Sequence, residues 1–290
     1  MRYYITELES ENETLFFSFL SDGKNNFEKI KNMIEVNKNY NESNLETMAK
    51  MPDCFVDLTV TSPPYDNLRT YNGYCFDFEN IAKELYRITK QGGIVVWVVA
   101  DATENGSETL TSFRQAIYFK EIGFNIHDTM IYEKSGMANP SSNRYHQTFE
   151  YMFILSKGKP KTFNPIKDRE NKYKGVYGGE KSFRADFGMR FNVWRFANGG
   201  NNTSTDKVVF KHPAPFPDKL ANDHIISWSN ENDLVYDCFM GSGTVAKMSI
   251  LNNRNWIGSE ISNEYCNIIE ERIKKALEEK RSNKKVTDFK

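Results

Sequence analysis

The chain has 290 residues, of which 39% are hydrophobic, 27% charged and 14% aromatic, and its formal net charge is -1. This composition is typical of a globular protein with a sizeable core and excludes disordered and collagen-like chains. The longest apolar run, residues 94–100, is far shorter than the roughly 20 residues that a membrane-spanning helix needs, so we expect a cytoplasmic protein with no membrane partner.

The first half of the chain alternates between strand and helix patterns. Apolar residues that alternate with polar ones, or that form a continuous run, predict strands, and apolar residues at helical spacing predict helices. The predicted elements are, in order, a strand over 55–60, a helix over 78–88, a strand over 94–100, a helix over 112–122, and strands over 125–132 and 149–155. We expect Gly92 and Gly93 to stop the first helix and Gly123 to close the second.

The last third of the chain resumes the alternation. It predicts a helix over 220–228, a strand over 234–239, a helix that opens within 240–250, a strand over 256–260 and an amphipathic helix over 261–273. Strands that alternate with helices predict an α/β sheet covered by helices on both faces. Residues 279–290 are expected to form a frayed charged tail.

Residues 157–211 break this rhythm. They carry thirteen Lys and Arg against five Asp and Glu, so the rest of the chain is acidic. Seven glycines and nine aromatic residues are interleaved with the cations, and no periodicity is sustained. We expect an inserted subdomain here, which divides the chain into 1–156, 157–211, 212–278 and the tail 279–290.

The cysteines and histidines do not suggest a metal site. The four cysteines include no C-x-x-C pair, and the four histidines show no zinc-type spacing. We therefore expect no bound metal.

Residues 237–244, DCFMGSGT, lead from a predicted strand through glycines into a helix. Gly241 and Gly243 would let the backbone approach a ligand closely, and the start of a helix offers unpaired N–H donors. Glu260 closes the next strand 17 residues after Gly243, where a carboxylate can accept hydrogen bonds from both ribose hydroxyls. The motif indicates a nucleoside-bearing cofactor. Taken alone, it is also compatible with a glycine turn that only reverses the chain.

Residues 61–65, TSPPY, end the strand predicted over 55–60. The two prolines fix the backbone so that the Ser62 hydroxyl and the Pro63 carbonyl can point the same way as a pair of acceptors, and Tyr65 offers a flat face. This arrangement suits an amino group on an aromatic ring. The alternative is a proline turn with a tyrosine in the core.

Together the two motifs resemble those of the beta-group amino-methyltransferases of DNA, which use S-adenosylmethionine to methylate N6 of adenine or N4 of cytosine. The catalytic motif comes first, the cofactor loop last and a variable recognition region between them, as in that circularly permuted group. The sequence HPAPFP at 212–217 also resembles the motif that precedes the cofactor strand. The resemblance covers most of the chain and implies a Rossmann-like class I methyltransferase mixed sheet with a small inserted target-recognition subdomain over 157–211.

The resemblance also implies catalytic and cofactor residues, and the basic segment and the residues just past the TSPPY loop offer arginines for DNA contact. The catalytic set is Ser62, Pro63, Pro64 and Tyr65. The cofactor set is Asp237, Phe239, Gly241, Ser242, Gly243, Thr244 and Glu260. The arginines proposed to contact DNA are Arg69, Arg184, Arg190 and Arg195. The sequence departs from the family pattern at Cys238, where proline is frequent, and at Ser43, where an acidic residue usually reaches the cofactor adenine.

The expected chemistry is direct methyl transfer. If the Ser62 hydroxyl and the Pro63 carbonyl accept both N–H bonds of the exocyclic amine, the nitrogen lone pair can point at the sulfonium methyl group. The base must first be flipped out of double-stranded DNA. Serine at the first motif position favours cytosine N4, and adenine N6 stays open. A homodimer and a cognate restriction endonuclease also stay open as partners.

Other classes fit the sequence less well. A nicotinamide dehydrogenase would need the full G-x-G-x-x-G spacing, but Lys247 follows Ala246 where a third glycine is expected. Protein and RNA methyltransferases with related loops usually place the cofactor motif before the catalytic one. A DNA-binding module without enzymatic activity would explain the basic segment but not the two ligand loops.

Overall fold

The computed structural model describes residues 34–64, 76–136, 142–172, 175–176, 183–196, 203–204 and 206–287. Contacts divide the chain into two units, Met1–Glu35 and Val36–Lys290, and the fold described below is that of the second unit. None of the helices in the described ranges combines the length and the apolar character that would let it span a lipid bilayer.

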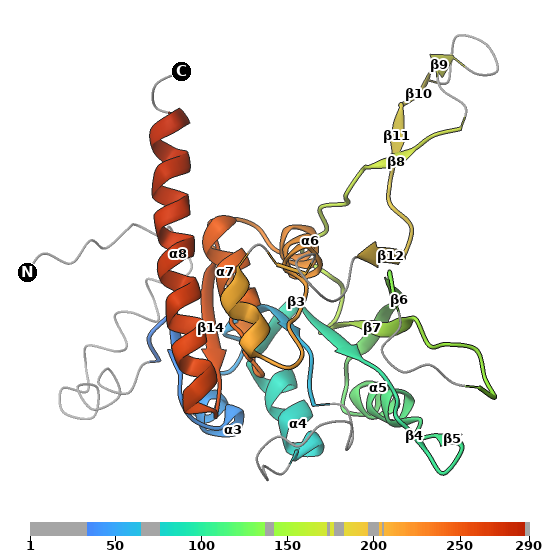
Figure 1. Cartoon of the computed structure of the whole chain (residues 1–290), viewed down its shortest axis with the longest axis horizontal. Coiled ribbons are helices and arrows are strands. Elements are labelled where there is room, and N and C mark those ends of the chain that lie inside the picture. The colour runs from blue at the N-terminus through green and yellow to red at the C-terminus, as the bar shows by residue number, and fades with distance from the viewer. Residues whose placement is uncertain are drawn as a thin grey trace, which may run out of the picture. The chain divides into compact units, whose positions relative to one another are not determined.

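Eight strands form one mixed sheet. They are β1 (Lys38–Tyr40), β2 (Val56–Thr61), β3 (Thr89–Val99), β6 (Asn125–Lys134), β7 (Phe149–Ser156), β12 (Val193–Phe196), β13 (Leu234–Asp237) and β14 (Asn255–Ser259). Their order across the sheet is β1–β14–β13–β2–β3–β7–β6–β12. Figure 1 labels five of them, β14, β3, β7, β6 and β12. Strand β7 runs antiparallel to its neighbours β3 and β6, and the other neighbouring pairs are parallel.

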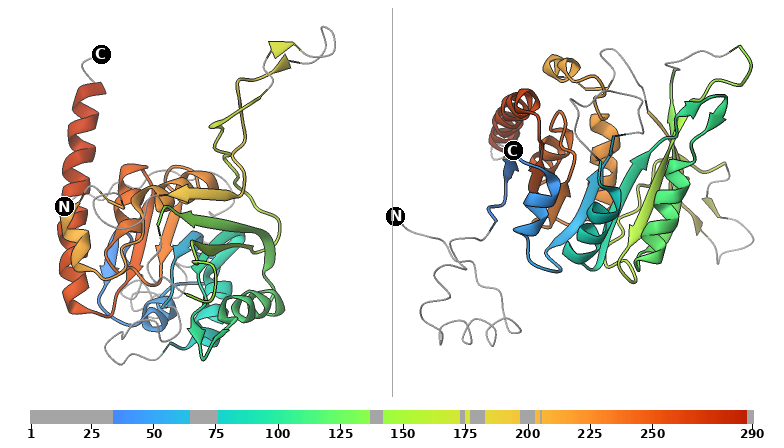
Figure 2. Two further views of the ribbon diagram at one scale, coloured as in Figure 1. Left: turned by 45° about the vertical axis from the view of Figure 1, so that its right-hand side comes forward. Right: turned by 90° about the horizontal axis from the view of Figure 1, so that it is seen from below.

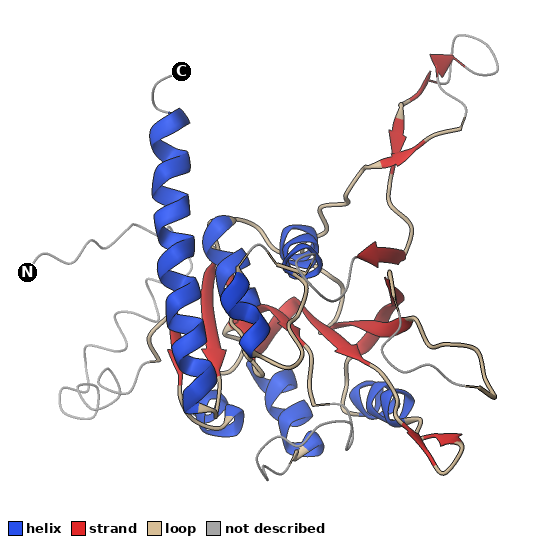
Figure 3. Cartoon of the chain, viewed as in Figure 1, coloured by secondary structure: helices blue, strands red, loops and turns tan. Residues whose placement is uncertain are grey.

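Helices cover both faces of this sheet (Figures 2 and 3). They are α3 (Asn44–Ala49), α4 (Phe78–Ile88), α5 (Thr111–Glu121), α6 (Asp218–Trp228), α7 (Thr244–Leu251), α8 (Asn263–Thr287) and the 3₁₀ helix η2 (Lys207–Lys211). Helices α4 and α5 contact β3, β6 and β7, with α3 beside α4, whereas α6 and α7 contact β2, β13 and β14, with α8 packed on α7. The predicted mixed sheet with helices on both faces is confirmed.

Three pairs of short strands lie outside the sheet. They are β4 (Thr103–Glu104) with β5 (Ser107–Glu108), β8 (Arg169–Glu170) with β11 (Phe187–Gly188), and β9 (Gly175–Val176) with β10 (Phe183–Arg184). The last two pairs belong to one long hairpin that extends from the sheet as an arm (Figure 1).

Strand β2 lies in the middle of the sheet, beside β13. Its apolar residues Val56, Leu58 and Val60 are buried as their alternation predicts, but Thr59 and Thr61 are buried as well. The polar positions are covered because helices lie on both faces. The Thr61 hydroxyl is satisfied by the Asp237 carboxylate of β13, with 2.7 Å between the two oxygens.

The glycine pair at 92–93 lies inside β3 and does not stop a helix, so that prediction is wrong. Helix α4 ends at Ile88, and β3 begins at Thr89. Gly92 has a φ of +80°, and a Cβ atom on it would come within 2.9 Å of the Lys161 Cβ. The register between β2 and β3 also shifts near this point. Glycine is needed here for a bulged strand that another segment approaches closely.

The C-terminal helix is longer than the sequence predicts. Helix α8 continues to Thr287 and therefore includes most of the segment that was expected to be a frayed tail from residue 279. Residues 279–287 contain no glycine or proline, so nothing in this stretch ends the helix. Strand β1 and helix α3 were not predicted, because each is short and only partly apolar.

Part of the predicted insertion over 157–211 belongs to the main fold. Strand β12 pairs with β6 at the edge of the sheet, and Trp194 and Phe196 join the core between the sheet and α6. Near the start of the insertion, Phe163 stacks on Trp228 of α6 with 4.9 Å between the ring centroids. The arm that carries β8 to β11 lies between these two anchored ends.

We predict that Gly92→Ala destabilises the protein more than Gly106→Ala does. Both glycines have positive φ, +80° and +83°, but a Cβ on Gly106 would meet nothing within 4 Å. The control variant, Gly106→Ala, should lose about 1–2 kcal/mol of unfolding free energy from backbone strain alone. Gly92→Ala should lose more, because Lys161 must also move. Urea unfolding measures both losses. Equal losses would show that the close approach at Gly92 has no energetic weight.

Candidate functional site

The two predicted ligand loops leave neighbouring strands at the same edge of the sheet. Residues 62–65 follow β2, and residues 238–243 follow β13, which pairs with β2 in parallel. Glu260 follows β14, which pairs in parallel with β13 on its other side. Because the carboxyl ends of parallel strands meet at one edge, the topology brings both loops and Glu260 together.

Asp237 is buried at the point where the two loops diverge. One carboxylate oxygen accepts hydrogen bonds from the Thr61 hydroxyl, at 2.7 Å, and from the Phe239 backbone N–H, at 3.0 Å. Burial raises the pKa of Asp237 to about 7, although these two hydrogen bonds act in the opposite direction. The side chain therefore ties β2 to the start of the glycine loop and can exchange a proton near neutral pH.

Glu260 supports the glycine loop from the neighbouring strand. Its two carboxylate oxygens accept the backbone N–H of Gly241 and of Ser262, each at 2.8 Å. Burial raises the pKa of this carboxyl group, partly offset by the backbone hydrogen bonds. Since each carboxylate oxygen can accept more than one hydrogen bond, the group retains capacity for ligand hydroxyls.

The structure explains the two glycines of the loop in a way that the sequence did not suggest. Gly241 and Gly243 have φ of +54° and +78°. A Cβ on Gly241 would lie 3.2 Å from His212 Nε2, and a Cβ on Gly243 would lie 3.2–3.3 Å from atoms of Ile269 in α8. At both positions glycine is required by backbone conformation and by packing against the protein itself, in addition to any room it leaves for a ligand.

The side chains of Ser242 and Thr244 face the protein interior. Arg272 of α8 donates from Nη1 to the Ser242 carbonyl at 2.8 Å, the Ser242 hydroxyl at 3.3 Å and the Thr244 hydroxyl at 2.8 Å. The Thr244 hydroxyl in turn donates to the carbonyl of Phe216 at 3.1 Å. These two predicted cofactor residues can thus offer a ligand their backbone atoms more readily than their hydroxyls.

The catalytic motif begins directly at the end of β2. Ser62 is half-buried, Pro63 is buried and Pro64 is half-buried, whereas Tyr65 lies outside the described residues. The Phe239 ring borders this region from the other loop, with centroid distances of 5.7 Å to Phe76 and 6.3 Å to Trp97. These rings form an aromatic wall next to the two loops.

Several polar residues near the site hold its loops, and sequence reasoning missed most of them. Asn41 Nδ2 donates to the Glu260 carbonyl at 2.9 Å, and Asn44 Nδ2 donates to the Cys238 carbonyl at 3.2 Å. Both asparagines follow β1, which has too few residues to produce a strand pattern. Ser43, at the position usually acidic in the family, caps α3.

Asp101, at the carboxyl end of β3, also has a local structural role. Its carboxylate accepts the Ser112 N–H at 2.8 Å and the Ser112 hydroxyl at 2.6 Å, so it caps the start of α5. A carboxylate at this position could contact a ligand or cap a helix, and the structure shows that Asp101 caps α5.

The four arginines predicted to contact DNA have different surroundings. Arg69 lies outside the described residues, as does the side chain of Arg184. Arg190 pairs with Asp168 and with Asp223, so its guanidinium is engaged within the fold. Arg195 is free to interact with a partner: its side chain is 69% exposed, and its contact with Glu133 is a long one of 3.8 Å.

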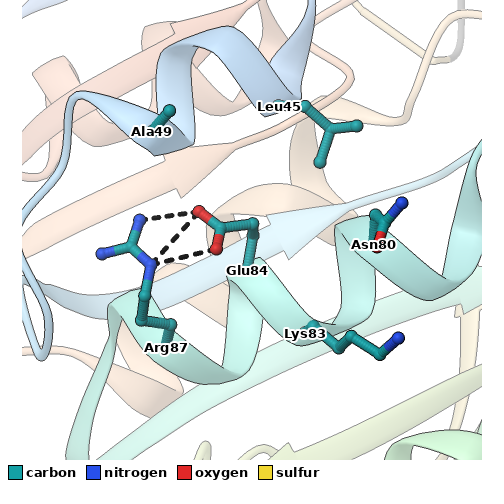
Figure 4. A pocket seen from close by; sticks show the side chains of 6 residues that line it. All are labelled: Leu45, Ala49, Asn80, Lys83, Glu84 and Arg87. Carbon is teal, nitrogen blue, oxygen red and sulfur yellow. Dashed lines mark hydrogen bonds and ion pairs between the residues drawn. The ribbon is translucent and has the colours of Figure 1, made fainter.

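A shallow groove between α3 and α4 contains none of the predicted site residues (Figure 4). It is lined by Leu45, Ala49, Asn80, Lys83, Glu84 and Arg87. Arg87 donates to Glu84 and to the carbonyls of Met48 and Met51, so it fastens α4 to the end of α3. Arg87 and Glu84 of this groove thus stabilise the packing of α4 against α3.

The loop residues fit a nucleoside cofactor that carries a positive charge. Buried carboxyl groups at the ends of β13 and β14 suit a cation and ribose hydroxyls, and the start of α7 supplies backbone N–H donors beside them. S-adenosylmethionine has both features.

Comparisons with known proteins find relatives over most of the chain. A family model described as DNA methylase, of the N6/N4 methyltransferase type, matches residues 56–271. Orphan methyltransferase M.BamHII of Bacillus amyloliquefaciens is 61% identical over 238 residues, which are 77% of this chain and 90% of the relative. Type II methyltransferase M.BglII of Bacillus subtilis is 29% identical over 254 residues, 80% of this chain and 68% of the relative.

Solved structures share the fold. PvuII DNA methyltransferase, described as cytosine-N4-specific, matches with a TM-score of 0.65 and 21% identity over 83% of this chain and 87% of its own. M1.HpyAVI in its complex with SAM matches with a TM-score of 0.56 and 21% identity over 81% of this chain and 98% of its own. The family and the fold class predicted from the two motifs are confirmed, and the chain belongs to the N6/N4 DNA methylase family.

Proposed function

We propose that this protein transfers the methyl group of S-adenosylmethionine to the exocyclic amino group of a flipped base in double-stranded DNA, with cytosine N4 as the target. One observation carries the proposal: the TSPPY loop and the glycine loop leave adjacent parallel strands that the buried Thr61–Asp237 hydrogen bond holds together. Donor and acceptor of the methyl group would then meet at one edge of the sheet.

In this proposal the catalytic loop orients the nucleophile. The Ser62 hydroxyl and the Pro63 carbonyl accept the two N–H bonds of the amine, which localises the nitrogen lone pair and stabilises the positive charge that develops there. The bound cofactor supplies an electrophilic sulfonium methyl group. Asp237 and Glu260, held at the strand ends, would bind its cationic and ribose parts and fix the distance between the reactants.

The choice of cytosine rests on Ser62 at the first position of the motif. Adenine N6 is the second candidate, since the family includes both activities. Sequencing of DNA from cells that express the protein, by a method sensitive to both modified bases, distinguishes the two. Modified adenine alone would overturn the choice of cytosine but not the proposed reaction.

We predict that Ser62→Ala lowers the methyl-transfer rate constant by about 100-fold or more, because one of two preorganised acceptors is lost. The dissociation constant for S-adenosylmethionine should stay within about twofold of the wild type, since the hydroxyl is assigned to the base and not to the cofactor. Single-turnover methylation and calorimetry measure the two quantities. The exposed serine variant Ser107→Ala is the control, and full activity of Ser62→Ala would refute the assigned role.

The proton on Asp237 gives a pH dependence to cofactor binding. Its pKa of about 7 is raised by burial, and a bound cation favours the ionised carboxylate. The dissociation constant for S-adenosylmethionine should therefore fall as the pH rises from about 6 to about 8. The Asp237→Asn variant should bind S-adenosylmethionine more weakly, and its dissociation constant should lack this pH dependence. The comparison separates titration of Asp237 from titration of the cofactor itself. Parallel pH curves for the two proteins would contradict the contact.

DNA binding is expected to involve Arg195 near the carboxyl end of β12. Since β12 runs parallel to β6 and β6 runs parallel to β3, this arginine lies toward the same edge of the sheet as Ser62. Arg195→Gln should weaken DNA binding and reduce the slope of log affinity against log salt by about 1.

The matched control is Arg190→Gln, which should lower thermal stability because Asp168 and Asp223 lose their partner, without reducing that slope in the folded protein. Filter binding over a series of salt concentrations provides the comparison. An unchanged slope for Arg195→Gln would remove this residue from the DNA interface.

A further inference from the structure

Two cations are buried behind the glycine loop. Arg272 of α8 is fully buried, and the side chain of Lys247 of α7 is 5% exposed. Each is paired with the same two carboxylates, Asp206 and Asp218. Burying two cations beside two partly buried carboxylates is costly unless all are paired and hydrogen-bonded, so this cluster calls for a specific explanation.

Arg272 joins this cluster to the glycine loop. Lys247 Nζ donates to Asp206 at 2.7 Å and to Asp218 at 2.8 Å. Arg272 reaches the same carboxylates at 3.2 Å and 2.7 Å and, in addition, donates to the Ser242 carbonyl and the Thr244 hydroxyl of the cofactor loop. The planar guanidinium can bond to the carboxylates and to the loop at the same time, because its five N–H donors point in fixed, different directions.

The hydrogen bonds of Arg272 fall on Ser242 and Thr244, at a turn that the Gly243 N–H closes on the Met240 carbonyl at 2.8 Å. Gly241 and Gly243 flank Ser242, and both have positive φ, so the peptide between them has few steric restraints of its own. The loop is held on one side by Glu260, through the Gly241 N–H, and on the other by Arg272, through the Ser242 carbonyl. The start of α7 and the turn before it are therefore fixed from both sides.

We infer that Arg272 is a positioning residue that holds the glycine loop in its cofactor-binding conformation, and that Asp206 and Asp218 act as the anchor for its guanidinium. The inference rests on the proposed function, because it assigns the loop to S-adenosylmethionine. Ion pairing with Lys247 and Arg272 outweighs the effect of burial and lowers the pKa of Asp206, which keeps this carboxylate ionised.

A pair of charge-balanced double variants tests this role. Arg272→Met with Asp218→Asn removes one cation and one anion and leaves Lys247 paired with Asp206. Lys247→Met with Asp218→Asn removes the same charges but keeps Arg272, its pair with Asp206 and its bonds to the loop. A purely structural cluster would respond alike to both changes, whereas a positioning role would not.

We expect the Arg272 double variant to bind S-adenosylmethionine about tenfold or more weakly than the wild type, the change expected when a charged hydrogen bond that holds the binding conformation is lost. The Lys247 double variant loses the same Asp218 carboxylate but keeps Arg272 on Asp206, so it should bind S-adenosylmethionine at least about threefold more tightly than the Arg272 double variant. Calorimetry without DNA measures the affinities, and thermal unfolding compares the stabilities. Equal weakening in both variants, or none in the Arg272 variant, would overturn the inference.

Arg272→Lys keeps the buried charge but loses the planar fork, so it provides a second test if the double variant does not fold. It should also weaken cofactor binding, with a larger effect on the cofactor KM than on kcat, and an unchanged affinity in the folded protein would count against the role. Absence of S-adenosylmethionine binding by the wild-type protein would overturn the proposed function itself, so the two failures are distinguishable.

Discussion

The arrangement of the site depends on one buried hydrogen bond, from the Thr61 hydroxyl to the Asp237 carboxylate. It joins the last residue of β2 to the last residue of β13, at the point where the two ligand loops begin. In the low dielectric of the interior such a bond is strong, and an unsatisfied partner would be costly. The separation of the TSPPY loop from the glycine loop is thus set by the core of the sheet and not by the loops themselves.

Much of the fold could be predicted because its strands are either alternating or fully apolar, and its ligand motifs lie at strand ends. Val56, Leu58 and Val60 mark β2, and the run at 94–100 marks β3, so the TSPPY loop could be placed at the edge of a sheet. The glycines and Glu260 marked the other loop in the same way. Motif order then indicated the family without knowledge of any contact.

The contacts that hold the site could not be predicted, because they join residues far apart in the sequence. Arg272 lies about one turn beyond Ile269 in an ordinary amphipathic helix, and nothing in its neighbourhood distinguishes it from a solvated arginine. The glycines at 92–93 have the same composition signal as a helix end. Asn41 and Asn44 follow a three-residue strand that leaves no periodic pattern.

The two ends of the basic segment are built into the body of the enzyme. Trp194 and Phe196 complete the core beside β6, and Asp206 joins the charge cluster beneath the cofactor loop. Within the described part of the hairpin between Arg169 and Gly188, the strands pair only with each other. Exchange of this segment between relatives is therefore least disruptive to the fold within that hairpin, whereas a splice placed after Val193 would replace side chains of the core and of the charge cluster behind the glycine loop.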